Sequence, residues 1–233
     1  MSNPSDEELA AVAQRRSQAY WLLARCFAEV PSAGFFDELQ HSLASDAATV
    51  AVDEPLAAES AALVTALLGV AKDEGAVQDL AMEFTRLFSG ISKSYGGPPP
   101  FESIAREGAW GGDTVAAVVQ AYADAGISPP LPEGAPPDHL GAELRFLALA
   151  CYHEAQAWSG AERELALEWL DREQDFLDQH ILPWVPAYCS ALAALAHKPL
   201  YQALLALTPL ACQNDRQDID AILKAVAPSP DHG

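Results

Sequence analysis

Basic side chains are scarce in this 233-residue sequence, which has 13 lysines and arginines against 33 aspartates and glutamates. The formal net charge is −20. We therefore expect no nucleic-acid partner, because phosphate binding requires clustered Lys and Arg. The acidic excess has two readings that composition leaves open. It either serves solubility alone, or it attracts a basic ligand by raising the encounter rate at low salt.

Long apolar runs are also missing. None approaches the roughly 20 residues that cross a bilayer, so we expect no membrane insertion. The four cysteines are scattered, without a C-x-x-C pair, at Cys26, Cys151, Cys189 and Cys212. Each lies in an apolar helical pattern, which predicts reduced, buried thiols in a soluble cytoplasmic protein. With 50% hydrophobic residues, a chain of this length can bury a core without disulfides or metals.

Motifs of the common enzyme classes are absent, since there is no G-x-S-x-G nucleophile elbow and no G-x-x-x-x-G-K-S/T phosphate loop. A metal site is the remaining chemical candidate, because His139 and Glu143 are i, i+4 neighbours and His153 lies further along the same side. A zinc site needs at least three converging ligands, and no close Cys/His cluster supplies them. We expect no catalysis and no cofactor or metal; a metal-dependent helical hydrolase is the enzyme alternative.

The N-terminal region contains Arg15-Arg16 before a short apolar run, a pattern that superficially resembles a twin-arginine export signal. Arg25 stops the run, and no small-residue cleavage site follows. We therefore predict that Arg15 and Arg16 are polar-face residues of a first helix that ends near Glu29.

Helical periodicity recurs along almost the whole chain and strand alternation almost nowhere, which predicts an all-α, bundle-like fold. The clearest helical stripe comprises Val77, Leu80, Ala81, Phe84, Leu87 and Phe88. Capping boxes and first-turn prolines mark several expected helix starts. These are Ser5-x-x-Glu8, Ser159-x-x-Glu162, Pro183, Pro199 and Pro209.

Two proline-rich breaks interrupt the helical pattern. The first, 89–100, ends in Pro98-Pro99-Pro100, and the second, 127–137, holds five prolines. Successive prolines lack N–H donors and cannot continue a helix. We predict an N-terminal helical subdomain over 1–126, a hinge over 127–137 and a C-terminal helical subdomain over 138–233.

The segment after the second break combines capping and titratable residues. Asp138 can cap the helix that follows the prolines, which by itself would explain an aspartate there. His139 and Glu143 need another explanation, because a titratable pair in an apolar helix is costly to desolvate. Either they satisfy one another, or they face a groove in which Asp138 and Glu143 meet an arginine-bearing peptide.

Aromatic and acidic residues follow the first break in the same way. Phe101, Glu102 and Trp110 combine aromatic surface with a carboxylate directly after the triple proline. They are either ordinary core aromatics with a solvated Glu, or part of the same peptide site.

Taken in order, these segments resemble the TorD/DmsD family of redox-enzyme maturation chaperones. The resemblance spans about residues 17–207. It is carried by Glu83-Phe84-x-x-Leu87-Phe88, Pro100-Phe101-Glu102-Ser103, Asp138-His139-Leu140-x-x-Glu143-Leu144-x-Phe146-Leu147 and Phe176-x-x-x-His180-Ile181-x-x-Trp184.

The resemblance implies a non-catalytic, all-α chaperone of two subdomains, a monomer or a domain-swapped dimer. Its partner would be the precursor of an exported molybdenum-cofactor enzyme, held through its twin-arginine signal peptide until the cofactor is loaded. The implied peptide-binding residues are Pro136, Asp138 and His139, and we add Glu143, Phe101, Glu102 and Trp110. GTP binding is associated with some members, but no phosphate loop supports it here. A nitrate-reductase-type assembly chaperone, whose enzyme faces the cytoplasm, is the alternative.

Overall fold

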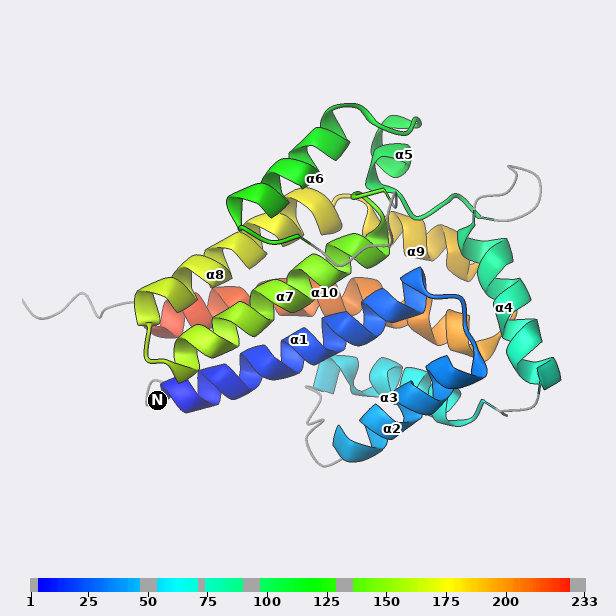
Figure 1. The fold of residues 1–233 in the computed structure, drawn as a ribbon, viewed down its shortest axis with the longest axis horizontal. Coiled ribbons are helices and arrows are strands. Elements are labelled where there is room, and N and C mark those ends of the chain that lie inside the picture. The colour runs from blue at the N-terminus through cyan, green and yellow to red at the C-terminus, as the bar shows by residue number, and fades with distance from the viewer. Residues whose placement is uncertain (1–3, 47–53, 71–73, 90–96, 129–135, 227–233) are drawn as a thin grey trace, which may run out of the picture.

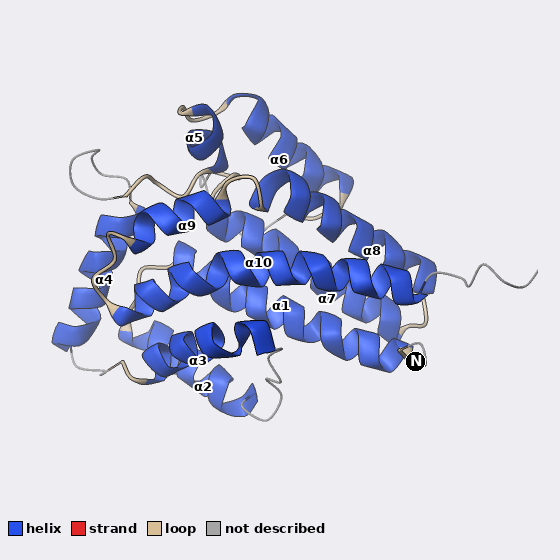
Figure 2. Cartoon of the chain, turned by 180° about the vertical axis from the view of Figure 1, so that it is seen from behind, coloured by secondary structure: helices blue, strands red, loops and turns tan. Residues whose placement is uncertain are grey.

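The computed structural model describes residues 4–46, 54–70, 74–89, 97–128 and 136–226. Within these ranges the chain is helical and has no named strand, which confirms the predicted all-α class (Figures 1 and 2). The helices are α1 (Asp6–Ala28), α2 (Ala33–Asp46), α3 (Glu54–Leu68), α4 (Glu74–Phe88), α5 (Glu102–Glu107), α6 (Gly112–Asp124), α7 (Leu140–Ser159), α8 (Arg163–Phe176), η1 (Leu177–Ile181), α9 (Val185–Ala193) and α10 (Pro199–Val226).

Helices α1 and α7 form the centre of the molecule, and α10 lies beside them (Figure 1). Small residues allow α1 and α7 to approach closely. Gly141 is one of them: a Cβ there would come 2.7 Å from the Cβ of Ala28 and 3.2 Å from the carbonyl oxygen of Ala24. The Ser17 hydroxyl donates a hydrogen bond to the carbonyl of Ala148 (2.7 Å), so it is satisfied inside this contact.

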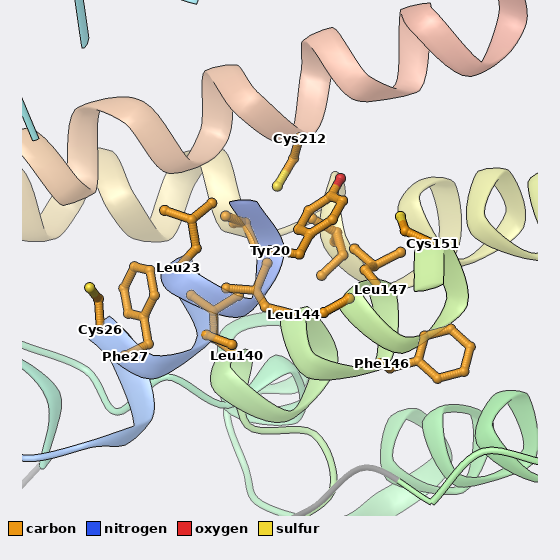
Figure 3. Packing of buried hydrophobic residues seen from close by; sticks show 14 of the residues in the cluster. Tyr20, Leu23, Cys26, Phe27, Leu140, Leu144, Phe146, Leu147, Cys151 and Cys212 are labelled. Carbon is orange, nitrogen blue, oxygen red and sulfur yellow. The ribbon is translucent and has the colours of Figure 1, made fainter. Parts of the chain in front are cut away.

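One hydrophobic cluster fills the space between these helices (Figure 3). Figure 3 shows side chains from α1, α7 and α10 meeting in it, and the four cysteines are all buried free thiols. Labelled members are Tyr20, Leu23, Cys26, Phe27, Leu140, Leu144, Phe146, Leu147, Cys151 and Cys212. Residues from both sides of the second proline-rich break therefore share one core. Most of that break lies outside the described residues, so the division into two subdomains stays a prediction.

Arg16 corrects the expectation of two solvent-facing arginines in the first helix. Its side chain is only 9% exposed and binds Glu154 (2.6 Å), Glu173 (2.5 Å) and Asp215. Asp215 also accepts a hydrogen bond from the Tyr20 hydroxyl (2.6 Å). One guanidinium, with its fork of fixed donors, thus joins carboxylates from α7, α8 and α10 to α1.

Some of the predicted helix starts are confirmed and others are wrong. The Ser5 capping box is present, since the Ser5 Oγ accepts from the Glu8 amide (3.2 Å) and a Glu8 oxygen accepts from the Ser5 amide (2.8 Å). Pro199 begins α10, as expected. The Ser159 prediction is wrong, because Ser159 is the last residue of α7 and the next helix begins at Arg163 without a side-chain cap.

The other two prolines are also placed differently from the prediction. Pro183 lies in the turn before α9, whose first-turn proline is Pro186. Pro209 lies inside α10, where the helix continues through it because buried Leu205, Leu207 and Cys212 hold both sides in the core. This packing outweighs the roughly 3 kcal/mol that an interior proline costs.

None of the helices in the described ranges combines the length and the apolar character that spanning a membrane would require.

Candidate functional site

The chain after the triple proline runs alongside the segment that leads into α7. Phe101 and His139 form an isolated antiparallel bridge. The Leu140 amide donates to the carbonyl of Pro100 (2.8 Å), and the Glu102 amide donates to the carbonyl of Asp138 (3.0 Å). Two regions that the sequence singled out separately are therefore held together by backbone hydrogen bonds.

Asp138 caps a helix, but not the one expected. Its side chain is fully buried, and its Oδ2 accepts from both the Ser103 amide (3.0 Å) and the Ser103 hydroxyl (2.6 Å). Ser103 is in the first turn of α5, which has no cap from its own chain neighbour Phe101. The prediction that Asp138 caps α7 is thus wrong, because the bridge turns its carboxylate toward the free amides of α5.

His139 is the residue that caps α7. Its Nδ1 accepts a hydrogen bond from the Gly141 amide (2.9 Å), and its ring meets Phe101 edge to face at 5.4 Å between centroids. Burial lowers the pKa of His139 to about 4; the charge of Asp138 opposes this shift and Arg145 adds to it. The imidazole is therefore neutral at pH 7, as an Nδ1 acceptor must be.

Glu102 lies at the centre of a second set of contacts. It is fully buried, its Oε2 is 3.0 Å from His180 Nδ1, and its Oε1 accepts from Arg106 (2.5 Å), which is 40% exposed. His180 belongs to η1, a π-helical turn that continues α8, and its carbonyl accepts from Trp184 Nε1 (2.6 Å). A single π-helical turn redirects side chains relative to the preceding helix and is frequent at functional sites.

Glu143 is also fully buried, and neither of its oxygens makes a hydrogen bond of normal geometry within the part of the chain that the structure describes. Burial, with the nearby charges of Glu102 and Asp138, raises its pKa well above the ordinary value for a glutamate. The protonated form of this carboxyl is therefore favoured more strongly than in an exposed glutamate. Glu143 does not pair with His139 and lies below the surface, so a part in peptide binding stays a prediction.

Trp110 lies on the turn between α5 and α6 and is 64% exposed. The turn carries left-handed glycines at Gly108 (φ +75°), Gly111 (φ +100°) and Gly112 (φ +79°). The Gly111 amide donates to the Ser103 hydroxyl (3.4 Å), so the turn is linked to Asp138 through one side chain. The peptide-binding residues expected from the sequence therefore gather in one place.

The expected peptide-binding residues differ in how far their side chains are exposed to solvent. Glu102, Asp138 and Glu143 are buried, whereas Phe101, Pro136, His139 and Trp110 reach the surface to different extents. We call these last four residues the junction surface. It offers rings and a proline to solvent, and the buried Asp138 carboxylate beneath it binds the Ser103 amide.

Three residues of the site carried no role in the sequence analysis: Ser103, Arg106 and His180. Ser103 and His180 belong to the quoted motifs, but only the fold shows that they contact Asp138 and Glu102. For His180, the sequence did contain a signal: a histidine inside the apolar pattern from Phe176 to Trp184 is expected to be buried, and a buried imidazole needs a polar partner.

The proposed metal ligands do not converge. His153 is exposed and stacks on Trp169 at 4.9 Å, away from the buried Glu143. One group of the described residues has metal-ligand spacing, namely Cys151, Glu154 and Glu173. Both carboxylates of that group bind the Arg16 guanidinium, which supplies the positive charge there.

Comparison with known proteins identifies a family and several relatives. The family model described as the nitrate reductase delta subunit matches residues 50–190. Chaperone protein TorD of Vibrio cholerae serotype O1 (strain M66-2) is 26% identical over 223 residues, covering 94% of this chain and 98% of the relative. Chaperone protein TorD of Aeromonas salmonicida (strain A449) is 25% identical over 183 residues, covering 78% and 80%.

A solved structure of a protein from Archaeoglobus fulgidus, described as concerned with redox enzyme maturation, superimposes with a TM-score of 0.45 and 16% identity. The match covers 94% of this chain and 96% of that one.

Proposed function

Because the chain belongs to the nitrate reductase delta subunit family, we propose that it is a system-specific chaperone for the maturation of a molybdenum-cofactor oxidoreductase. In this proposal it works in the cytoplasm, as a monomer or a domain-swapped dimer, and binds the twin-arginine signal peptide of the enzyme precursor before export. The alignment with TorD chaperones over 94% of the chain supports a binding role without a catalytic step.

The observation that carries the peptide-binding part is the bridge between Phe101 and His139. It brings the partly exposed rings of Phe101 and His139 together edge to face, with Trp110 on the adjoining turn. Amphipathic rings with little conformational freedom are the usual anchors for an apolar peptide segment. The hydrophobic segment of the signal peptide packs on this junction surface.

The arginine pair of the peptide needs accessible carboxylates, and the buried Asp138 and Glu143 do not provide them. Glu107 and Asp113 flank Trp110 in sequence and are both exposed. We assign the arginine contacts to Asp113 and to Glu107 Oε2, because Glu107 Oε1 already accepts from Thr114. The net charge of −20 adds long-range attraction, which fades beyond a Debye length of about 8 Å at physiological salt.

The test is a titration of a fluorescent twin-arginine peptide against the wild type, the Trp110→Ala variant and the Asp138→Ala/His139→Ala double variant. We expect both variants to bind about tenfold more weakly or worse, since each loses contacts or positioning at the junction surface. Trp110 is exposed, so its removal leaves the core intact. Unchanged affinity in both variants would rule out the site.

Two controls accompany this titration. An Asp171→Ala/Gln217→Ala variant removes exposed polar groups from α8 and α10 and should bind as the wild type does. Raising the salt concentration should weaken binding of the twin-arginine peptide. Affinity that does not depend on salt would remove the electrostatic part of the proposal.

A second candidate is a nitrate-reductase-type assembly chaperone, which the description of the matching family favours. Such a protein would bind its enzyme away from any signal peptide. Co-purification with a client precursor that lacks its signal, together with failure to bind the isolated peptide, would select this candidate.

A further inference from the structure

We infer that Asp138 is a positioning residue, which never touches the bound peptide but holds, through Ser103, the turn that presents Trp110 to it. This inference rests on the proposed peptide-binding function. Ser103 is then a positioning residue too, and Trp110 is the residue that contacts the peptide.

Asp138 cannot meet a ligand from where it lies. Its side chain has no exposed surface, and the segments on both sides of it are joined by the backbone bonds from Glu102 to Asp138 and from Leu140 to Pro100. Its Oδ2 is already shared by the amide and hydroxyl of Ser103. Its Oδ1 is buried as well, so a peptide guanidinium could reach the carboxylate only if the paired segments around it moved apart.

Ser103 links Asp138 to the turn between α5 and α6 through its hydroxyl. A hydroxyl has one hydrogen to donate and lone pairs that accept. The Ser103 hydroxyl donates to Asp138 Oδ2 (2.6 Å) and accepts from the Gly111 amide (3.4 Å). The bond to Asp138 is buried and shielded from water, and the bond from Gly111 is partly buried.

The other side of the turn is fixed by Glu107. Its Oε1 accepts from the amide of Thr114 (3.2 Å) and from the Thr114 hydroxyl, so it caps the start of α6. Trp110 lies between these two attachments, on a backbone that turns through left-handed glycines. A large ring with 64% exposure is thus held on a doubly anchored turn. Such pre-arrangement lowers the ordering cost of binding.

The decisive comparison is Asp138→Asn with Asp138→Ala in the twin-arginine peptide titration. The asparagine carboxamide oxygen can still accept both Ser103 bonds, but it carries no charge. We expect Asp138→Asn to bind within about threefold of the wild type and Asp138→Ala to bind about tenfold more weakly. Equal losses in the two variants would show that the charge itself meets the peptide and would overturn the inference.

A double-mutant cycle gives an independent check that allows for partial destabilisation. If Asp138 and Ser103 act only through Trp110, adding Asp138→Ala or Ser103→Ala to Trp110→Ala should cost no further affinity. Multiplying losses would contradict the inference. The matched control is Trp21→Ala, which removes another partly exposed tryptophan, on α1, and should combine independently with Asp138→Ala.

A readout without peptide separates this inference from the proposed function. With 5-fluorotryptophan incorporated, the fluorine resonance of Trp110 is assigned by its loss in Trp110→Phe. We expect that resonance to keep its position and width in Asp138→Asn and to shift or broaden in Asp138→Ala and Ser103→Ala. An unchanged resonance in all three would overturn the positioning role. Absence of peptide binding by the wild type would sink the proposed function instead.

Discussion

At the scale of single residues, the capping roles of Asp138 and His139 are exchanged relative to what their order in the sequence suggests. His139 accepts from the first-turn amide of α7, and Asp138 serves α5. His139 has extended backbone, whereas Asp138 lies in the turn just before it, and each side chain reaches a different helix start. The pair thus joins two helices that are more than thirty residues apart in the sequence.

The capping role of His139 predicts the outcome of two substitutions. His139→Ala removes the acceptor for the Gly141 amide and should lower the free energy of unfolding by about 1 kcal/mol, whereas His139→Asn, a good capping residue, should retain most of it. Urea unfolding at pH 7 measures both. Equal losses in Ala and Asn would mean that ring packing on Phe101, not capping, is what the histidine contributes.

The same residue has a pH signature. Its folded pKa of about 4 lies below the ordinary 6.5, so the unfolded chain protonates first as the pH falls. Stability should therefore decline from about pH 6.5 downward to about pH 4 in the wild type. The part of this decline that is due to His139 should be missing in His139→Asn.

Glu173 makes the opposite prediction. Burial raises its pKa to about 8; Arg16 opposes the shift, and the charges of Glu154 and Asp215 add to it. The unfolded chain gives up this proton near the ordinary 4.5 while the folded chain keeps it, so stability falls as the pH rises between these values.

Glu173→Gln should flatten that dependence, because the amide oxygen still accepts from Arg16 and has no proton to lose. At pH 8 the variant should be at least as stable as the wild type by chemical unfolding. Asp171→Asn, an exposed position on the same helix, is the control and should keep the wild-type slope. An unchanged slope in Glu173→Gln would show that this carboxyl is ionised in the folded protein.

At the scale of elements, the turn between α5 and α6 depends on backbone conformations with positive φ, which residues other than glycine rarely adopt. Gly111 has φ +100°, and a Cβ there would meet nothing within 4 Å. The cost of Gly111→Ala is therefore conformational and not steric, and we expect a loss of about 1 kcal/mol in the free energy of unfolding and weaker peptide binding.

Gly34→Ala is the matched control, because Gly34 lies in α2 with only the Ser32 hydroxyl near its Cβ position, at 3.9 Å. An alanine in a helix should leave stability unchanged or raise it by up to about 1 kcal/mol. Thermal unfolding of both variants decides the matter. A neutral Gly111→Ala would show that the turn readily takes another shape.

Helix identities followed from the sequence more readily than helix ends did. The stripe from Val77 to Phe88 predicted α4, because apolar spacing reports which face is buried. The helix starts predicted at Ser159 and Pro209 are wrong, since a capping pattern and a first-turn proline are local signals that packing overrides. The π-helical turn that carries His180 left no recognisable local pattern.

At the scale of the whole molecule, the meeting of Phe101 and Asp138 was partly predictable, because the resemblance to known chaperones pointed to their segments. Trp110 was added only because it follows the triple proline. What the sequence could not supply was which carboxylates are buried. That depends on contacts between helices far apart in the chain, as in the pairing of Arg16 with Glu154 and Asp215. Because Glu102, Asp138 and Glu143 are buried, this site exposes less negative charge to a ligand than the acidic composition suggests.

The central claim is that a signal peptide binds at the junction surface, and amide hydrogen exchange with and without saturating twin-arginine peptide tests it most directly. We predict slower exchange on binding in residues 101–112 and 136–140, with α2 and the C-terminal half of α10 unchanged. Protection confined to α2, α3 or α10, with none around the bridge between Phe101 and His139, would contradict the account.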